Sequence, residues 1–286
     1  MEERESLAIR FLYGTALGRM CLKALVRPGF SQRMARLLNA SVSRVLIRPY
    51  IRRHQILMDG YERKNYRCFN DFFTRRRKQE ALRIDMEPSH LISPCDSLLT
   101  AYRITQDRRF TIKRCTYSLE ELLRDRFLAQ RYTGGLCLIF RLTPHHYHRY
   151  CYIDDGRKGE NFSVPGVLHS VRPMCCGTQP VYVQNQREYT VMDTVHFGKV
   201  IQVEVGALMV GRIRNAQGPG RMVRGQEKGY FEFGGSTILL LLEPGVVKLE
   251  EQIFRRTARG QEYPVRQGQQ IGQALGWIGE ESEACP

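Results

Sequence analysis

The chain has 286 residues, of which 42% are hydrophobic. This composition excludes a disordered or a collagen-like chain, and the length is sufficient to bury one or two hydrophobic cores. The net charge of +15, from 44 Lys and Arg against 29 Asp and Glu, predicts an anionic partner, for which the candidates are nucleic acid, anionic lipid and an acidic metabolite.

Residues 6–58 are predicted to be helical. Hydrophobic residues recur there at spacings of three and four, while Arg19, Lys23 and Arg27 form a basic line along another face. Pro28, which is followed by a glycine, is expected to end the first helix. One interpretation is a helical cap with solvated charges. The other is a basic amphipathic surface that lies among lipid head groups.

Any contact with a membrane is expected at its surface. Acidic and basic residues interrupt the N-terminus from Glu2 onward, so no signal peptide is predicted. No apolar stretch approaches the roughly 20 residues that cross a bilayer. Residues 236–286 contain five basic and seven acidic side chains, so residues 1–235 carry +17 and are expected to provide the surface that meets an anionic partner.

The segment NDFFTRRRK combines two Phe with four bases after a helix start predicted at Asn70 or Asp71, and its composition alone is typical of a solvated charged face. From about Leu91 short apolar runs alternate with Gly, Pro and Asp, which is typical of strands, with one short helix in SLEELLRD. The predicted class is α+β. A basic, helical, membrane-facing part over residues 1–90 precedes a β-rich, Gly-punctuated part over residues 91–286.

Two short segments of the β-rich part resemble each other. RGQEKGYF, from Arg224, and RQGQQIGQAL, from Arg266, both contain an Arg, then a Gly, then a second Gly four residues later. Glycines at this spacing suit a pair of quasi-symmetric β-hairpins. Chance similarity is the alternative.

Cysteines and histidines indicate which chemistry is available. The nine cysteines have no regular spacing and no CxxC pair, which argues against a zinc site or a disulfide scaffold and favours a reducing compartment. His145, His146 and His148 cluster, but a second group with ligand spacing is missing, so no metal is predicted and proton transfer is favoured. Asp96, in the turn SPCDS, either caps its own backbone or orients a histidine, as the third member of a triad does.

Ser236 follows Phe-Gly-Gly and begins the apolar run STILLLL. Local sequence alone favours a hairpin corner. However, a serine that follows glycine has an unhindered carbonyl beside its own hydroxyl, and glycine adopts the backbone angles that an attack requires. With a base nearby, Oγ can attack the carbonyl of Gly235 and convert the amide into an ester. β-Elimination then leaves dehydroalanine, which hydrolyses to a pyruvoyl group and ammonia.

Together these segments resemble the phosphatidylserine decarboxylase family. GGST within RGQEKGYFEFGGSTILLL resembles the family's self-cleavage site, and FLYGTALGR suits its short, GGST-bearing, prokaryotic-type branch. The resemblance runs from about residue 9 to residue 275. Companion segments occur in the family's order, namely FNDFFTRRRK, SPCDS, YHRYCY, NQREYTVMDT and VEVGALMVGRI.

The resemblance implies a proenzyme that cleaves itself between Gly235 and Ser236. The products would be a β chain, residues 1–235, and an α chain, residues 236–286, which remain together as a heterodimer. Ser236 would become a covalent pyruvoyl group, so the implied cofactor is pyruvate. The implied reaction decarboxylates phosphatidylserine to phosphatidylethanolamine through a Schiff base.

The resemblance also assigns roles and a location. Asp96 matches the family's charge-relay Asp, and His148 matches the His of the YHR segment, which suits it to deliver a proton to the substrate. Residues 91–286 would be the catalytic part. The implied location is peripheral, on the cytoplasmic side of the cell membrane, with phosphatidylserine in an anionic leaflet as the partner, and association into a homo-oligomer stays open.

Two positions depart from the family's pattern. Ser97 stands where many members have Gly, which a turn tolerates, and Cys151 stands where YHRxH has its second His, the usual partner of the charge-relay Asp. We favour His148 as the base, with Cys151 as a poorer one. Other candidates for the base are His145, His146 and His169. If no residue acts as the base, the chain is a cleavage-deficient relative that binds anionic lipid. A nucleic-acid-binding protein is disfavoured, because no such motif is present.

Overall fold

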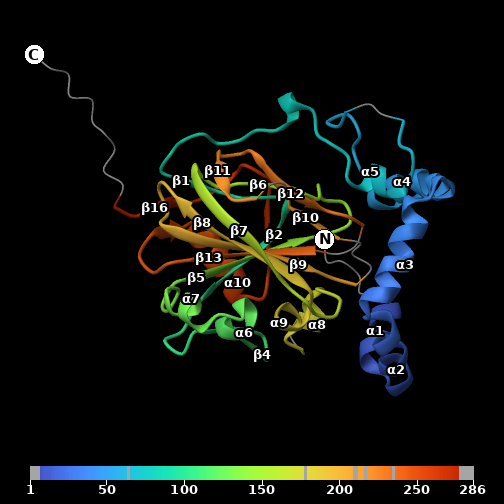
Figure 1. Ribbon diagram of the computed structural model, residues 1–286, viewed down its shortest axis with the longest axis horizontal. Helices are drawn as coiled ribbons and strands as arrows, with labels where there is room; N and C mark the ends of the chain where they lie inside the picture. Colours follow the sequence, from blue (N-terminus) through green and yellow to red (C-terminus); the bar gives the residue numbers. More distant parts are fainter. Residues whose placement is uncertain are drawn as a thin grey trace, which may run out of the picture.

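A helical part and a β-rich part lie side by side in the computed structural model (Figure 1). This mixture of helices and sheets confirms the predicted α+β class. No helix among the described residues is long and apolar enough to cross a membrane. The structure describes residues 7–62, 65–176, 179–208, 212–215, 218–233 and 236–276.

The predicted N-terminal helices are present and stand as a column beside the sheets (Figure 1). The first helix pair ends before Pro28, as expected, but Pro28 itself begins the next helix, because a first helical turn needs no backbone N–H from proline. The helix in NDFFTRRRK begins at Phe69, one residue before Asn70, the earlier of its two predicted starts. The elements are α1 (Leu7–Gly14), α2 (Ala16–Leu25), α3 (Pro28–Asn39), a 3-10 helix (Ser41–Leu46), α4 (Ile47–His54), α5 (Phe69–Phe73) and a 3-10 turn (Gln79–Ala81).

An eight-stranded antiparallel sheet forms the centre of the β-rich part. Strand β13 lies inside this sheet, between β9 and β5, and all seven of its residues are buried. Burial on both faces explains why STILLLL reads as a continuous apolar run rather than an alternating one. In spatial order the strands are β11 (Gly220–Met222), β7 (Gly156–Val164), β8 (Arg187–Thr194), β9 (Lys199–Gly206), β13 (Ser236–Leu242), β5 (Leu136–Leu142), β2 (Ser97–Arg103) and β15 (Tyr263–Val265).

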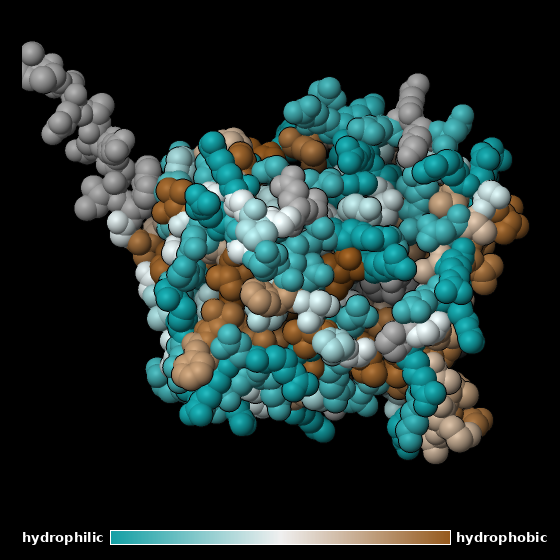
Figure 2. All heavy atoms as spheres, viewed as in Figure 1, coloured by the Kyte–Doolittle hydropathy of each residue, from teal (hydrophilic) through white to brown (hydrophobic). Residues whose placement is uncertain are grey.

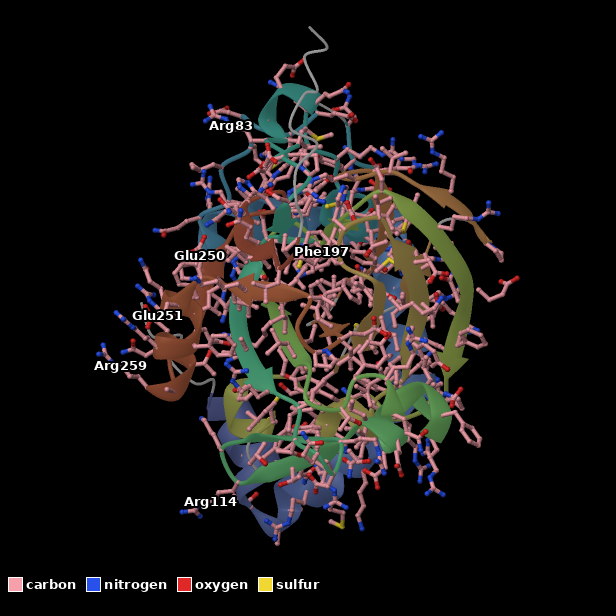
Figure 3. All side chains as sticks on the ribbon, turned by 90° about the vertical axis from the view of Figure 1, so that its left-hand side faces the viewer. Arg83, Arg114, Phe197, Glu250, Glu251 and Arg259 are labelled. Atoms are coloured by element: carbon pink, nitrogen blue, oxygen red, sulfur yellow. The ribbon has the colours of Figure 1, made fainter. Side chains whose placement is uncertain are left out.

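Each face of this sheet has its own hydrophobic core. One face, the helical face, is covered by a hairpin and four short helices: β3 (Arg109–Ile112), β4 (Cys115–Ser118), α6 (Leu119–Leu123), α7 (Arg126–Gln130), α8 (Pro173–Cys176) and α9 (Val181–Gln184). The other, the small-sheet face, is covered by two three-stranded sheets and one helix: β10 (Ile213–Asn215), β12 (Glu227–Phe231) and β6 (Arg149–Cys151); β1 (His90–Ile92), β16 (Gln270–Ala274) and β14 (Val247–Leu249); and α10 (Glu251–Ala258). Figure 3 shows Phe197 inside the β-rich part, while Glu251 and Arg259, at the two ends of α10, point away from it.

The resemblance between the two Gly-containing segments is a structural repeat. β12 and β16 are each the central strand of a three-stranded antiparallel sheet. Gly225 and Gly268 precede them at φ of 75° and 81°, where L side chains are strained. A Cβ at Gly225 would lie 2.9 Å from Ile84, and one at Gly268 would lie 2.6 Å from the same side chain. Glycine is therefore required twice, for the same two reasons.

The aromatic pair of NDFFTRRRK belongs to the core of the helical part. Phe72 and Phe73 are buried, and Phe73 packs edge-on against Phe233 at 5.1 Å. The expectation of a solvated charged face is wrong for Arg75, which is 3% exposed with its guanidinium 4.4 Å from the ring centre of Tyr61. Stacking on aromatic rings offsets the loss of hydration, and composition alone does not reveal it.

Candidate active site

Ser236 is the first residue of β13 and lies at one end of the central strand. It pairs with Leu142 of β5 and with Gly206 of β9, and it is fully buried. Because side chains alternate along a strand, its hydroxyl shares the small-sheet face with Ile238. Among the described residues Oγ has no hydrogen-bond partner. The predicted cleavage partner Gly235 lies outside the described residues.

His148 presents an unused ring nitrogen in a buried setting. Its Nδ1 lies 2.9 Å from the carbonyl oxygen of His146, which only accepts, so Nδ1 carries the proton and Nε2 keeps a lone pair. Nε2 is buried and has no hydrogen-bond partner among the described residues. Burial, with a smaller effect from the cation of Arg75, holds the pKa of His148 well below its usual value. The imidazole is therefore neutral and able to accept a proton.

An aromatic cluster connects His148 to the segment that leads into Ser236. The backbone N–H of Phe231 donates to the carbonyl oxygen of His148 at 3.0 Å. The Phe73 ring packs against the imidazole, with ring centres 4.2 Å apart, and against Phe233 at 5.1 Å. Phe231 and Phe233 lie five and three positions before Ser236. The two candidate catalytic residues thus belong to one end of the β-rich part.

The other candidate histidines differ from His148 in how their nitrogens are used. Nδ1 of His146 accepts the backbone N–H of Thr143 at 3.0 Å, and burial lowers the pKa of His146 to about 3. His145 is exposed. Nδ1 of His169 lies 3.3 Å from the hydroxyl of Tyr13, in the helical part. None of these has a buried ring nitrogen left without a partner among the described residues, as His148 does.

Asp96 pairs with an arginine that the sequence did not indicate. Its carboxylate contacts Arg77 through both oxygens, with Nη1 3.1 Å from Oδ1, and it accepts the backbone N–H of Gln267 at 2.9 Å. Gln267 lies in the second half of the internal repeat, and the first half makes the same backbone bond, from the N–H of Arg224 to Asp155 at 2.9 Å. The backbone bond is therefore part of the repeated turn, whereas the ion pair with Arg77 is specific to Asp96. The charge-relay role of Asp96 stays a prediction.

Cys151 lies beside the SPCDS turn. Its backbone N–H donates to the carbonyl of Pro94 at 2.9 Å, and its side chain is fully buried. Burial raises the pKa of the Cys151 thiol to about 12. A thiol that stays protonated at neutral pH is a poor base, so the structure disfavours Cys151 in that role.

A buried ion pair next to Ser236 was not predicted from the sequence. Nζ of Lys228 lies 2.8 Å from Oε1 of Glu204 and 2.8 Å from Oδ1 of Asn215, and both charged side chains are fully buried. Glu204 pairs with Ile238, so it shares the face of Ser236 at a diagonal position about 7 Å away. The available signal was an acid within the apolar strand VIQVEVG. The pair ties β12, which precedes the candidate cleavage site, to β9, which flanks it.

Removing one partner of this pair should cost stability. We expect Lys228→Met to lower the free energy of unfolding by about 3–5 kcal/mol, because the charge of Glu204 would remain buried without its cation. Replacing both, with Lys228→Met and Glu204→Leu, should cost less than the single change. Urea unfolding measures both, with exposed Lys248→Met as the control. A loss below 1 kcal/mol for Lys228→Met would show that water reaches the pair.

Comparisons with known proteins agree on one family. The family model described as phosphatidylserine decarboxylase matches residues 69–273. The phosphatidylserine decarboxylase proenzyme 2 of Clostridium acetobutylicum is 44% identical, over 93% of this chain and 91% of the relative. The proenzymes of Ruminiclostridium cellulolyticum and Clostridium kluyveri are 38% and 36% identical, over 92% of this chain and 90% and 91% of theirs. The chain belongs to the phosphatidylserine decarboxylase family.

Proposed function

We propose that the chain is the proenzyme of a pyruvoyl-dependent phosphatidylserine decarboxylase, which forms phosphatidylethanolamine. Family membership and the proenzyme names of its relatives support this activity, and they count against a cleavage-deficient lipid-binding protein. The observation that carries the site is a pair of buried atoms without partners among the described residues, Oγ of Ser236 and Nε2 of His148. A buried polar group in this state needs an explanation, and catalysis is one.

Self-cleavage would use these two atoms. Nε2 of His148 accepts the proton of Ser236 as Oγ attacks the carbonyl carbon of Gly235. The C–N bond then breaks, the amine takes a proton, and an ester links the two chains. Elimination releases the carboxylate of Gly235 and leaves dehydroalanine at position 236, which takes up water and loses ammonia. The result is a pyruvoyl group at the start of the smaller chain.

The surroundings of Ser236 fit such a group. Continuing the register of β2 and β5 places Ser97 opposite Leu142, in the same row of the sheet as Ser236 and about 10 Å away. Oγ of Ser97 is also buried without a partner among the described residues, so a second hydroxyl on this face is available to a bound substrate. The pyruvoyl group supplies an electron sink when CO2 leaves. A proton taken up at Nε2 of His148 is readily given back, because burial disfavours the charged imidazole.

The two products would remain one heterodimer. After cleavage β13 belongs to the smaller chain, whereas β5 and β9 belong to the larger one. The main chain of β13 pairs with both neighbours over residues 236–241, and its side chains contribute to both cores. Separating the chains would expose all of this surface, so cleavage changes the covalent structure without releasing the strand.

The helical part, residues 1–90, would hold the enzyme on the cytoplasmic face of an anionic membrane as a peripheral protein. Large apolar side chains are exposed on its outer surface, where they lie among hydrophilic residues (Figure 2, right-hand side). They are Phe11, Leu17, Met20, Leu37, Val42, Val45, Leu46 and Leu57. Each basic residue close to an anionic surface adds roughly 1 kcal/mol to the attraction.

Vesicles of phosphatidylserine test the function directly. The wild-type protein is expected to release CO2 from them and to leave phosphatidylethanolamine. A correctly folded, fully processed protein that releases no CO2 would overturn the proposal.

The membrane contact makes its own prediction. The double variant Val42→Asp, Val45→Asp should bind anionic vesicles at least tenfold more weakly in a sedimentation assay, because each valine that enters the lipid contributes about 1.5 kcal/mol or more. Val195→Asp, at a valine equally exposed in the turn between β8 and β9, is the matched control and should bind normally. Equal binding by all three proteins would contradict the proposed membrane surface.

A further inference from the structure

A cavity of about 530 Å³ lies between the helical part and the segment that leads to Ser236. Helix α3 contributes Arg36 and Asn39 to its lining, and the β-rich part contributes Arg212, Arg214 and Glu232. Arg36 and Asn39 are three residues apart, so they lie on one face of the helix. The cavity therefore opens where the membrane-facing helices meet the catalytic part.

Positive charge dominates this cavity, because three arginines and only one glutamate line it. Nε of Arg214 lies 2.9 Å from Oε1 of Glu232, so one arginine is already neutralised. Within the described part of the chain, Arg36 and Arg212 have no ion-pair partner, and both are exposed. Arg36 lines the cavity from α3 and Arg212 lines it from the β-rich part, so two guanidinium groups are available to an anion there. Phosphate oxygens match the forked donor geometry of a guanidinium group.

Hydrogen bonds connect the cavity wall to the reacting end of the chain. Oδ1 of Asn39 accepts from Nδ2 of Asn70 at 3.2 Å, and Oδ1 of Asn70 accepts the backbone N–H of Phe233 at 3.1 Å. Glu232, in the wall itself, is four positions before Ser236, a span of at most about 14 Å. Two hydrogen bonds and a short stretch of chain therefore connect the cavity wall to the group formed at position 236.

The substrate's own chemistry requires an anion site near the pyruvoyl group. In phosphatidylserine only three bonds separate the phosphorus atom from the carbon that loses CO2, so the phosphodiester must be held next to the pyruvoyl group. The acyl chains must remain in the lipid. Leu37, the neighbour of Arg36 on α3, is 58% exposed and belongs to the proposed membrane surface. One helix thus presents an apolar side chain to the bilayer and a cation to the cavity.

We infer that Arg36 and Arg212 bind the phosphodiester group of the lipid substrate, while Glu232 holds Arg214 in the cavity wall. This inference rests on the proposed function. His148 and Ser236 act in self-cleavage, whereas the two arginines would bind the substrate. The hydrogen bonds from Asn39 through Asn70 to Phe233 would then hold the bound phosphodiester in a fixed position relative to the segment before Ser236.

Steady-state kinetics with a soluble, short-chain phosphatidylserine test the site without a membrane. Arg36→Gln and Arg212→Gln should each process to two chains and should each raise KM at least tenfold, with the loss in KM rather than in kcat. Arg33→Gln, an equally exposed arginine on α3 outside the cavity lining, is the control for surface charge and should keep its KM. An unchanged KM for Arg36→Gln, or an equal rise for Arg33→Gln, would overturn the inference.

Competition distinguishes a lipid phosphodiester from free phosphate. Glycerophosphoserine should inhibit the wild type competitively and more strongly than inorganic phosphate, and Arg36→Gln should weaken this inhibition. Stronger inhibition by inorganic phosphate would overturn the assignment to a phosphodiester. The two proposals fail in different ways. A wild-type protein without turnover would contradict the proposed function. Turnover by the wild type with unaffected arginine variants would contradict only the phosphate site.

Discussion

His148→Ala is expected to slow self-cleavage by about 10²–10⁴-fold, the range that a positioned general base contributes. The reason is that Nε2 of His148 is the buried ring nitrogen that keeps a free lone pair, while Nδ1 is committed to the carbonyl of His146. The measurement is the fraction of uncleaved chain on a denaturing gel, followed over time after synthesis. Added imidazole should restore part of the rate, because the alanine variant leaves a space of its shape.

A neighbouring histidine supplies the control for this variant. Nδ1 of His146 already accepts the N–H of Thr143, so His146→Ala should cleave far faster than His148→Ala. The lowered pKa of His148 also fixes the sign of the pH dependence. An unperturbed histidine would gain a proton near pH 6.5 and stop accepting one, whereas His148 stays neutral below that value, so cleavage should persist at pH 6. Wild-type rates in His148→Ala would contradict the assignment.

Ser236→Ala should abolish cleavage and, with it, decarboxylation, because alanine offers neither a nucleophile nor a precursor of the pyruvoyl group. The matched control is Thr237→Val, which removes the next hydroxyl along β13. Thr237 is equally buried and its Oγ1 also has no partner among the described residues, but it faces the other side of the sheet. Removing an unpartnered hydroxyl costs little, so this variant should fold and cleave. Two chains from Ser236→Ala would show that the cleavage site is elsewhere.

Local patterns in the sequence predicted much of the fold. The hydrophobic spacing of residues 6–58 predicted helices, and the continuous apolar run STILLLL is typical of a strand that is buried on both faces, because each pattern reflects which faces are covered. The Gly spacing predicted a repeated element, since only glycine meets the strain and the crowding at Gly225 and Gly268, but the repeat consists of three-stranded sheets rather than hairpins. Strands with weaker patterns, such as β7 and β15, were not anticipated, because their formation depends on neighbours that are remote in sequence.

The sequence named candidate residues for the site but not the partners that the structure gives them. Ordered motifs named Ser236, Asp96 and His148 as candidates, yet nothing near Asp96 in the sequence indicates Arg77, which comes from the end of the helical part. The pairing of Lys228 with Glu204 likewise depends on how β12 packs on the large sheet. Such contacts join segments that only the tertiary fold brings together, so a single sequence does not encode them locally.

The intact mass of the purified protein is the most direct test of self-cleavage between Gly235 and Ser236. We expect two chains, residues 1–235 and residues 236–286, with the smaller one lighter by one NH3 than its unmodified sequence because a pyruvoyl group replaces the terminal serine. The smaller chain should also resist sequencing from its N-terminus until the carbonyl is converted to an amine. A single species of 33.2 kDa after long incubation, or a cut at any other bond, would contradict it.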